Sequence, residues 1–79
     1  MQIRVRLFAL FTKYAPKKNA ADAFELDMDP SGSVGDVFLK LGIPADYPRI
    51  AQVNGQMVGE NTCLKEGDVL RIFPPLPGG

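Results

Sequence analysis

The residues with the clearest chemical meaning form the last segment of the chain, Pro74-Pro75-Leu76-Pro77-Gly78-Gly79. Gly78 and Gly79 have no Cβ, so a segment that ends in them can thread a narrow channel into another enzyme's active site. There the carboxylate of Gly79 could attack the α-phosphate of ATP and form an acyl adenylate. The sequence therefore predicts Gly79 as the reacting residue, with Gly78 giving access.

The prolines before these glycines predict a stiff, extended tail. Pro74, Pro75 and Pro77 cannot donate hydrogen bonds to a sheet, so the last strand must end close to Phe73. A polyproline II segment rises ~3.1 Å per residue, which carries the chain end up to roughly 19 Å from the sheet. A stiff tail, with Leu76 between the prolines, loses less conformational entropy when a partner captures it. The alternative is a frayed end without function.

The composition excludes most other chemistry. The sequence contains no His, so a Ser-His or Cys-His nucleophile pair cannot be built. Cys63 is the only cysteine, which excludes an internal disulfide, a Cys₄ zinc site and an iron–sulfur cluster. Cys63 itself is expected to be a small hydrophobic residue rather than a sulfur relay. The spacing of the acidic residues Glu60, Glu66 and Asp68 indicates neither a metal site nor paired acid–base catalysis.

The charge balance bears on partners and location. Nine basic and nine acidic residues among 79 give a net charge of zero, which argues against nucleic acid or an anionic membrane as the main partner. No apolar run approaches the ~20 residues of a membrane span, and no signal peptide opens the sequence. We expect a cytoplasmic protein that lacks the parts of a self-sufficient enzyme.

Hydrophobic patterning predicts the elements that must position the tail. Residues 3–10 alternate as a strand. One face carries Ile3, Val5, Leu7 and Ala9, and the other carries Arg4, Arg6, Phe8 and Leu10. A loop at 13–22 and a second strand at 23–28 complete a long-looped hairpin.

The second half of the chain predicts one helix and three strands. Ser33 is a suitable N-cap, the apolar stripe of Val34, Val37, Phe38 and Leu41 has helical spacing, and Gly42 suits the position after the helix. Residues 50–53 and 56–58 form strands around the turn Asn54-Gly55, and 69–73 form the last strand.

The order β-β-α-β-β-β is typical of an α+β protein with the β-grasp, or ubiquitin-like, fold. The first and last strands are then parallel neighbours at the centre of a mixed sheet that packs on one helix. Residues 1–73 form this domain, and residues 74–79 form the tail.

Two aromatic residues on the outer face of the sheet predict a partner interface. Phe8 shares its face with Arg4 and Arg6, and Phe73 shares its face with Arg71. If the two strands are parallel neighbours, both rings lie near the point where the tail leaves the sheet. Exposed apolar clusters of this kind mark partner surfaces, and Leu10 could extend the cluster. Arg71 is also expected in this interface, where it could add charge complementarity; a solvated arginine is the alternative. The alternatives are that a loop covers the rings or that the core takes them through a bulge.

Three motifs resemble those of the MoaD/ThiS family of sulfur carriers: Val53-Asn54-Gly55, the run from Leu64 to Val69, and Phe73-Pro74-Pro75 closing on Gly78-Gly79. The resemblance covers essentially the whole chain. The Phe-Pro-Pro step is closer to MoaD, the small subunit of molybdopterin synthase. Pro77, the loop at 13–22 and the segment 43–49 depart from the MoaD pattern.

The resemblance implies a function for Gly79. An activating enzyme of the ubiquitin-activating (MoeB/ThiF) type adenylates it with ATP, a sulfur donor converts it to a thiocarboxylate, and the sulfur passes to a precursor. The chain itself would bind no cofactor or metal and would be a protein cosubstrate, or the small subunit of a molybdopterin synthase with a MoaE-like large subunit. In the family, apolar residues at positions matching Phe8 and Phe73 contact these partners.

Molybdopterin (molybdenum or tungsten cofactor) synthesis is the expected pathway, and synthesis of thiamine or another thio-metabolite is the alternative. Two other functions stay open. The chain could be a ubiquitin-like modifier that is conjugated to lysines through Gly79, or a β-grasp binding module with an inert tail.

Overall fold

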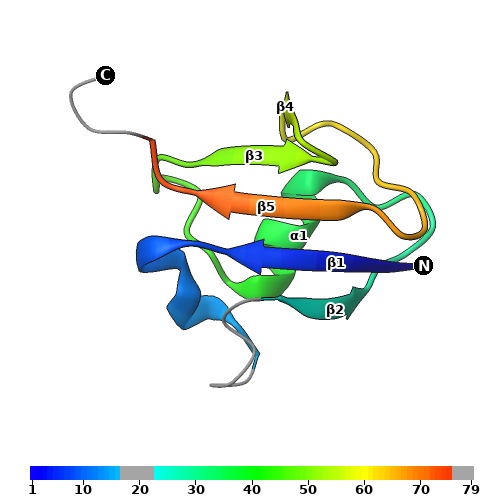
Figure 1. Ribbon diagram of the computed structural model, residues 1–79, viewed down its shortest axis with the longest axis horizontal. Coiled ribbons are helices and arrows are strands. Elements are labelled where there is room, and N and C mark those ends of the chain that lie inside the picture. The colour runs from blue at the N-terminus through cyan, green and yellow to red at the C-terminus, as the bar shows by residue number, and fades with distance from the viewer. Residues whose placement is uncertain (17–22, 76–79) are drawn as a thin grey trace.

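The computed structural model describes residues 1–16 and 23–75 (Figure 1). Its elements, in chain order, are β1 (Gln2–Leu7), the 3-10 helix η1 (Ala9–Tyr14), β2 (Phe24–Asp27), α1 (Val34–Leu41), β3 (Ile50–Val53), β4 (Gln56–Val58) and β5 (Val69–Phe73). Within the described ranges, no helix has the length and apolar character needed to cross a membrane.

The strands form one mixed five-stranded sheet in the order β2-β1-β5-β3-β4. The central pair, β1 and β5, is parallel, and the other pairs are antiparallel. Helix α1 crosses behind one face of this sheet (Figure 1). The predicted β-grasp fold is therefore confirmed, with the first and last strands side by side at the centre.

The core lies between α1 and the inner face of the sheet. Alternate residues of the central strands face it, as period-two patterning requires. Its fully buried side chains are Ile3, Val5, Phe11, Val34, Val37, Leu70 and Ile72.

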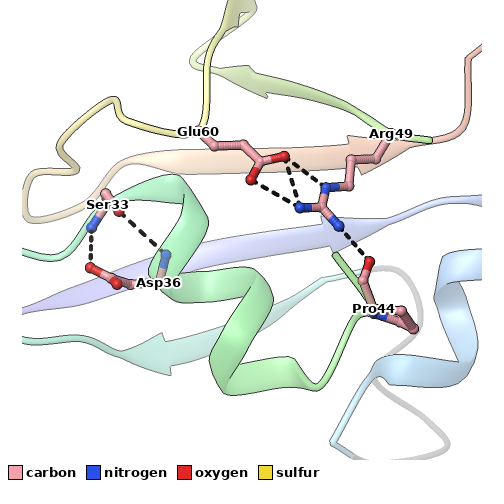
Figure 2. Close-up of polar contacts among 5 residues, drawn as sticks. All are labelled: Ser33, Asp36, Pro44, Arg49 and Glu60. Atoms are coloured by element: carbon pink, nitrogen blue, oxygen red, sulfur yellow. Dashed lines mark hydrogen bonds and ion pairs between the residues drawn. The ribbon is translucent and has the colours of Figure 1, made fainter. Parts of the chain in front are cut away.

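Helix α1 begins and ends where the sequence predicted. The Ser33 hydroxyl accepts a hydrogen bond from the Asp36 backbone N–H at 3.3 Å, and the Asp36 carboxylate accepts one from the Ser33 N–H at 3.0 Å (Figure 2). This capping box satisfies two N–H groups that the helix leaves free. Gly42 ends the helix in the left-handed region at φ 81°, which glycine adopts without strain.

The first strand is shorter than alternation predicted. Phe8 donates its N–H to the Ile72 carbonyl, and then Ala9 turns the chain with a φ of 54°. Residues 9–14 form η1, so Ala9 does not join the core face of the strand and residues 13 and 14 are helical rather than loop. The turn allows Phe11 to fill the core, where it is fully buried. The rest of the predicted loop, residues 17–22, lies outside the described residues.

Candidate functional site

The reactive end of the predicted tail, Leu76, Pro77, Gly78 and Gly79, lies outside the residues that the structure describes. Its root is described. Strand β5 ends at Phe73, as the prolines predicted, and Pro74 and Pro75 follow without strand pairing. Pro74 is half-buried and Pro75 is exposed, so the chain reaches the surface within two residues of the sheet.

Phe8 and Phe73 lie together on the outer face of the sheet at this root. Their ring centroids are 5.7 Å apart and their planes are inclined by 84°, an edge-to-face contact. Both side chains are partly buried, and neither belongs to the buried core. The pairing predicted from parallel β1 and β5 is confirmed, and we refer to these two residues as the aromatic pair.

Ile50 is a neighbour of the aromatic pair that was not predicted from the sequence. Ile50, the first residue of β3, is the register partner of Phe73 and is also partly exposed. Its side chain is on the outer face because Ala51, the next residue, is buried opposite Ile72. Alternation within residues 50–53 could have found Ile50 once the pairing of β3 with β5 was assumed.

Leu10 is exposed as predicted, but it lies on a different element from the predicted one. It lies on η1 rather than on the outer face of a strand, and 49% of it is exposed. Its part in a partner interface stays a prediction.

Charged side chains continue the outer face next to the aromatic pair. Arg71 on β5 lies in register between Arg6 on β1 and Gln52 on β3. The guanidinium carbon of Arg6 is 5.5 Å from the centroid of the Phe8 ring, a cation–π distance. Farther along β1, Arg4 forms an ion pair with Glu25 of β2 at 3.4 Å. Among the described residues, Arg6 and Arg71 are therefore register neighbours at the centre of the face, and Glu25 lies on the β2 edge.

Side-chain hydrogen bonds set the start of β5 and hence the position of Phe73. The Asn54 amide donates to the Asp68 carboxylate at 3.0 Å and accepts from the Val69 N–H at 3.0 Å. Asp68 also accepts from the Lys65 N–H at 2.8 Å. These hydrogen bonds join two of the motifs that carry the family resemblance, Val53-Asn54-Gly55 and the run from Leu64 to Val69. Their contact fixes the register of β5, the strand that leads into the tail.

Cys63 differs from its prediction as a small hydrophobic residue. Its side chain is exposed, while the next residue, Leu64, enters the core. Cys63 pairs with Ser33 in an isolated bridge, and this backbone pairing turns its side chain outward. Across the described ranges no cluster of His, Cys, Asp and Glu could hold a metal ion.

The mixed sheet with a central parallel pair and a single packed α-helix defines a ubiquitin-like β-grasp protein. The model of the ThiS family matches residues 5–79, so the chain belongs to the ThiS family, as the MoaD/ThiS resemblance predicted. The match includes the whole of the predicted tail.

Solved structures with the same fold come from several organisms. The Haloferax volcanii HVO 2177 protein is 27% identical, with a TM-score of 0.79 over 100% of this chain and 87% of its own. Small archaeal modifier protein 1 of H. volcanii is 21% identical, with a TM-score of 0.73 over 95% of this chain and 98% of its own. A chain of the complex between subunits 1 and 2 of the Helicobacter pylori molybdopterin-converting factor is 21% identical, with a TM-score of 0.64 over 100% of both chains. No match was found among curated proteins.

Proposed function

We propose that this protein is a sulfur carrier whose Gly79 carboxylate is adenylated and then converted to a thiocarboxylate. The observation that carries the proposal is the family match, which spans residues 5–79 and so includes Gly78 and Gly79. The fold supports it, because the central strand β5 delivers the chain directly to the prolines at the surface.

The proposed chemistry needs little from the carrier beyond presentation of its end. A carboxylate oxygen of Gly79 attacks the α-phosphate of ATP in the partner's active site, and pyrophosphate leaves. Hydrosulfide released by the sulfur donor then attacks the acyl carbon and AMP leaves, which gives the thiocarboxylate directly. The carrier supplies a folded domain that the partner can bind and a tail that reaches the partner's catalytic groups.

The outer face around the aromatic pair is the proposed docking surface for these partners. It combines Phe8 and Phe73 with Ile50 at the root of the tail, so a protein bound there receives the tail directly.

The H. pylori complex is an assembly of two subunits of a molybdopterin-converting factor, which supports a synthase-type large subunit as one partner. Molybdopterin synthesis is therefore our preferred pathway, and thiamine synthesis is the alternative in keeping with the matched family.

An intact-mass measurement tests the proposal. The protein is incubated with ATP, a sulfur source and the adenylating enzyme of its own organism, and we expect one oxygen to be replaced by sulfur at Gly79. Gly79→Ala should fold normally and lose the mass change. An unchanged wild-type mass, with an enzyme shown to be active on its own carrier, would contradict the carrier function.

A second function is favoured by one likeness. Small archaeal modifier protein 1 shares the fold, and adenylation of Gly79 would equally prepare conjugation to a lysine. Higher-mass conjugates in cell extracts that disappear with Gly79→Ala would indicate a protein modifier.

A further inference from the structure

Arg71 occupies the centre of the sheet's outer face. It lies on β5 between the buried residues Leu70 and Ile72, so its side chain points away from the core. Its register neighbours are Arg6 on one side and Gln52 on the other. A cation therefore stands beside a second cation in the middle of the face.

The described part of the chain leaves the Nε of Arg71 without an acceptor. This nitrogen is buried, and no carboxylate of residues 1–16 and 23–75 forms an ion pair with Arg71. A buried donor without an acceptor is unfavourable, above all on a charged group. Arg4 differs in this respect, because Glu25 pairs with it on the same face. An acceptor for this Nε is left to solvent or to a partner that binds this face.

The surroundings of Arg71 indicate the chemistry of that acceptor. Phe73 follows two residues later on the same face and contacts Phe8, so the aromatic pair lies next to Arg71 along this face. Arginine and aromatic side chains are the types that dominate binding energy at protein interfaces. The chain as a whole has zero net charge, whereas a nucleic acid requires an extended basic surface. A protein partner with a carboxylate side chain fits these features.

We infer that Arg71 recognises an aspartate or glutamate of the protein that docks on the aromatic pair. The inference rests on the proposed function, in which that protein is the adenylating enzyme that receives the tail. A carboxylate accepts two parallel hydrogen bonds from one edge of a guanidinium. One such edge of Arg71 includes Nε, the donor that has no partner. This edge faces the carboxylate once the side chain turns toward the partner protein. Arg71 then selects partners that place an acidic residue at this point.

Binding of the adenylating enzyme of the same organism tests this inference by calorimetry on four proteins: wild type, Arg71→Gln, Arg71→Lys and Arg4→Gln. We expect Arg71→Gln to raise Kd by at least about tenfold, because a buried carboxylate of the partner loses its cation. Arg71→Lys should raise Kd by less, since it keeps the charge but loses the two-point geometry. Arg4→Gln is the matched control, with the same charge change on the same face, and should alter Kd by less than about twofold.

Thermal unfolding of the same variants separates recognition from folding. Arg71→Gln should melt no lower than wild type, because it removes an unpaired donor and a like charge beside Arg6. Equal binding of wild type and Arg71→Gln, or equal losses in Arg71→Gln and Arg4→Gln, would overturn the inference. If the wild-type protein is still adenylated at Gly79 in that case, the proposed function holds although the inference about Arg71 fails. Wild type that is neither bound nor adenylated would contradict the proposed function itself.

Discussion

At the scale of single residues, Arg49 combines hydrogen bonds, an ion pair and a cation–π contact. Its Nε and one terminal nitrogen donate to the two Glu60 carboxylate oxygens at 2.8 and 2.9 Å, and its other terminal nitrogen donates to the Pro44 carbonyl at 2.6 Å (Figure 2). Its guanidinium carbon lies 4.2 Å from the Phe38 ring centroid, and only 8% of its side chain is exposed. Arg49 therefore ties the segment after α1 to the loop after β4.

The Arg49–Glu60 pair predicts a pH-dependent contribution to stability. The hydrogen bond from Arg49 holds the pKa of Glu60 below its ordinary value. A carboxyl group whose folded pKa is lowered stabilises the fold at pH above its unfolded pKa, and this contribution is lost as pH falls through the folded pKa. Glu60→Gln should therefore lower the unfolding free energy at pH 7 by about 1 kcal/mol or less, since half of the Glu60 side chain is exposed.

Urea denaturation of wild type and Glu60→Gln between pH 7 and pH 3 would measure this contribution. The difference between the two proteins should shrink as the pH falls below the ordinary glutamate value of about 4.3. Glu25→Gln removes the more exposed ion pair with Arg4 and serves as the control, with a smaller effect at every pH. A Glu60→Gln effect that stayed constant down to pH 3 would show that charge is not its cause.

At the scale of elements, the β3–β4 hairpin is coupled to β5 through Asn54. Asn54 has a left-handed backbone at φ 52° and makes side-chain hydrogen bonds to both Asp68 and Val69. Asn54→Ala should lower the unfolding free energy by about 2 kcal/mol, because it loses two hydrogen bonds and places alanine in a strained conformation. Asn61→Ala, at an exposed position, should change it by less than about 0.5 kcal/mol.

Chemical denaturation would compare the two variants. A small effect of Asn54→Ala, equal to that of Asn61→Ala, would mean that the turn alone sets the register of β5. The expected larger effect would show that the side-chain hydrogen bonds contribute.

Most of the elements could be predicted because each buries one face. Residues 50–53 and 69–73 form strands as expected, and the cap at Ser33 placed the start of α1. The first strand was predicted too long, because Phe8 continues the alternation of Arg4 and Arg6 although the chain turns at the next residue. That turn follows from the burial of Phe11, which depends on the space left by the rest of the core.

The site was partly predictable for a similar reason. The contact between Phe8 and Phe73 could be predicted because both residues lie on the outer face, near the ends of two strands expected to be parallel neighbours. Ile50, the hydrogen bonds of Asn54 and the unpaired Nε of Arg71 were missed. They depend on the pairing of β3 with β5 and on side-chain orientation, neither of which follows from the spacing within one segment.

At the scale of the whole molecule, we expect substitutions on the outer face of the sheet to weaken partner binding more than they weaken folding. Phe8→Ala removes half of the aromatic pair but no core residue, since Phe8 is only partly buried. It should weaken binding to the adenylating enzyme about tenfold or more and lower the unfolding free energy by no more than about 1.5 kcal/mol. Met57→Ala, an exposed control on β4 with 64% exposure, should leave both nearly unchanged.

Calorimetric binding and urea denaturation would be measured on both variants. Loss of stability without loss of binding in Phe8→Ala would assign the aromatic pair to folding alone.

The stiffness of the segment that joins β5 to the tail is expected to affect the KM of adenylation. Pro74 and Pro75 restrict the backbone between β5 and the tail, and neither takes part in strand pairing. Replacing both by glycine should leave the domain folded but raise the conformational entropy lost on capture, by about 1–2 kcal/mol in total. In steady-state adenylation this corresponds to a KM about five- to thirtyfold higher, with kcat at saturating carrier nearly unchanged. Because Pro74→Ala with Pro75→Ala keeps Cβ at both positions, its KM should fall between those of wild type and the glycine variant. Equal KM values for all three proteins would show that the tail is captured without any contribution from its stiffness.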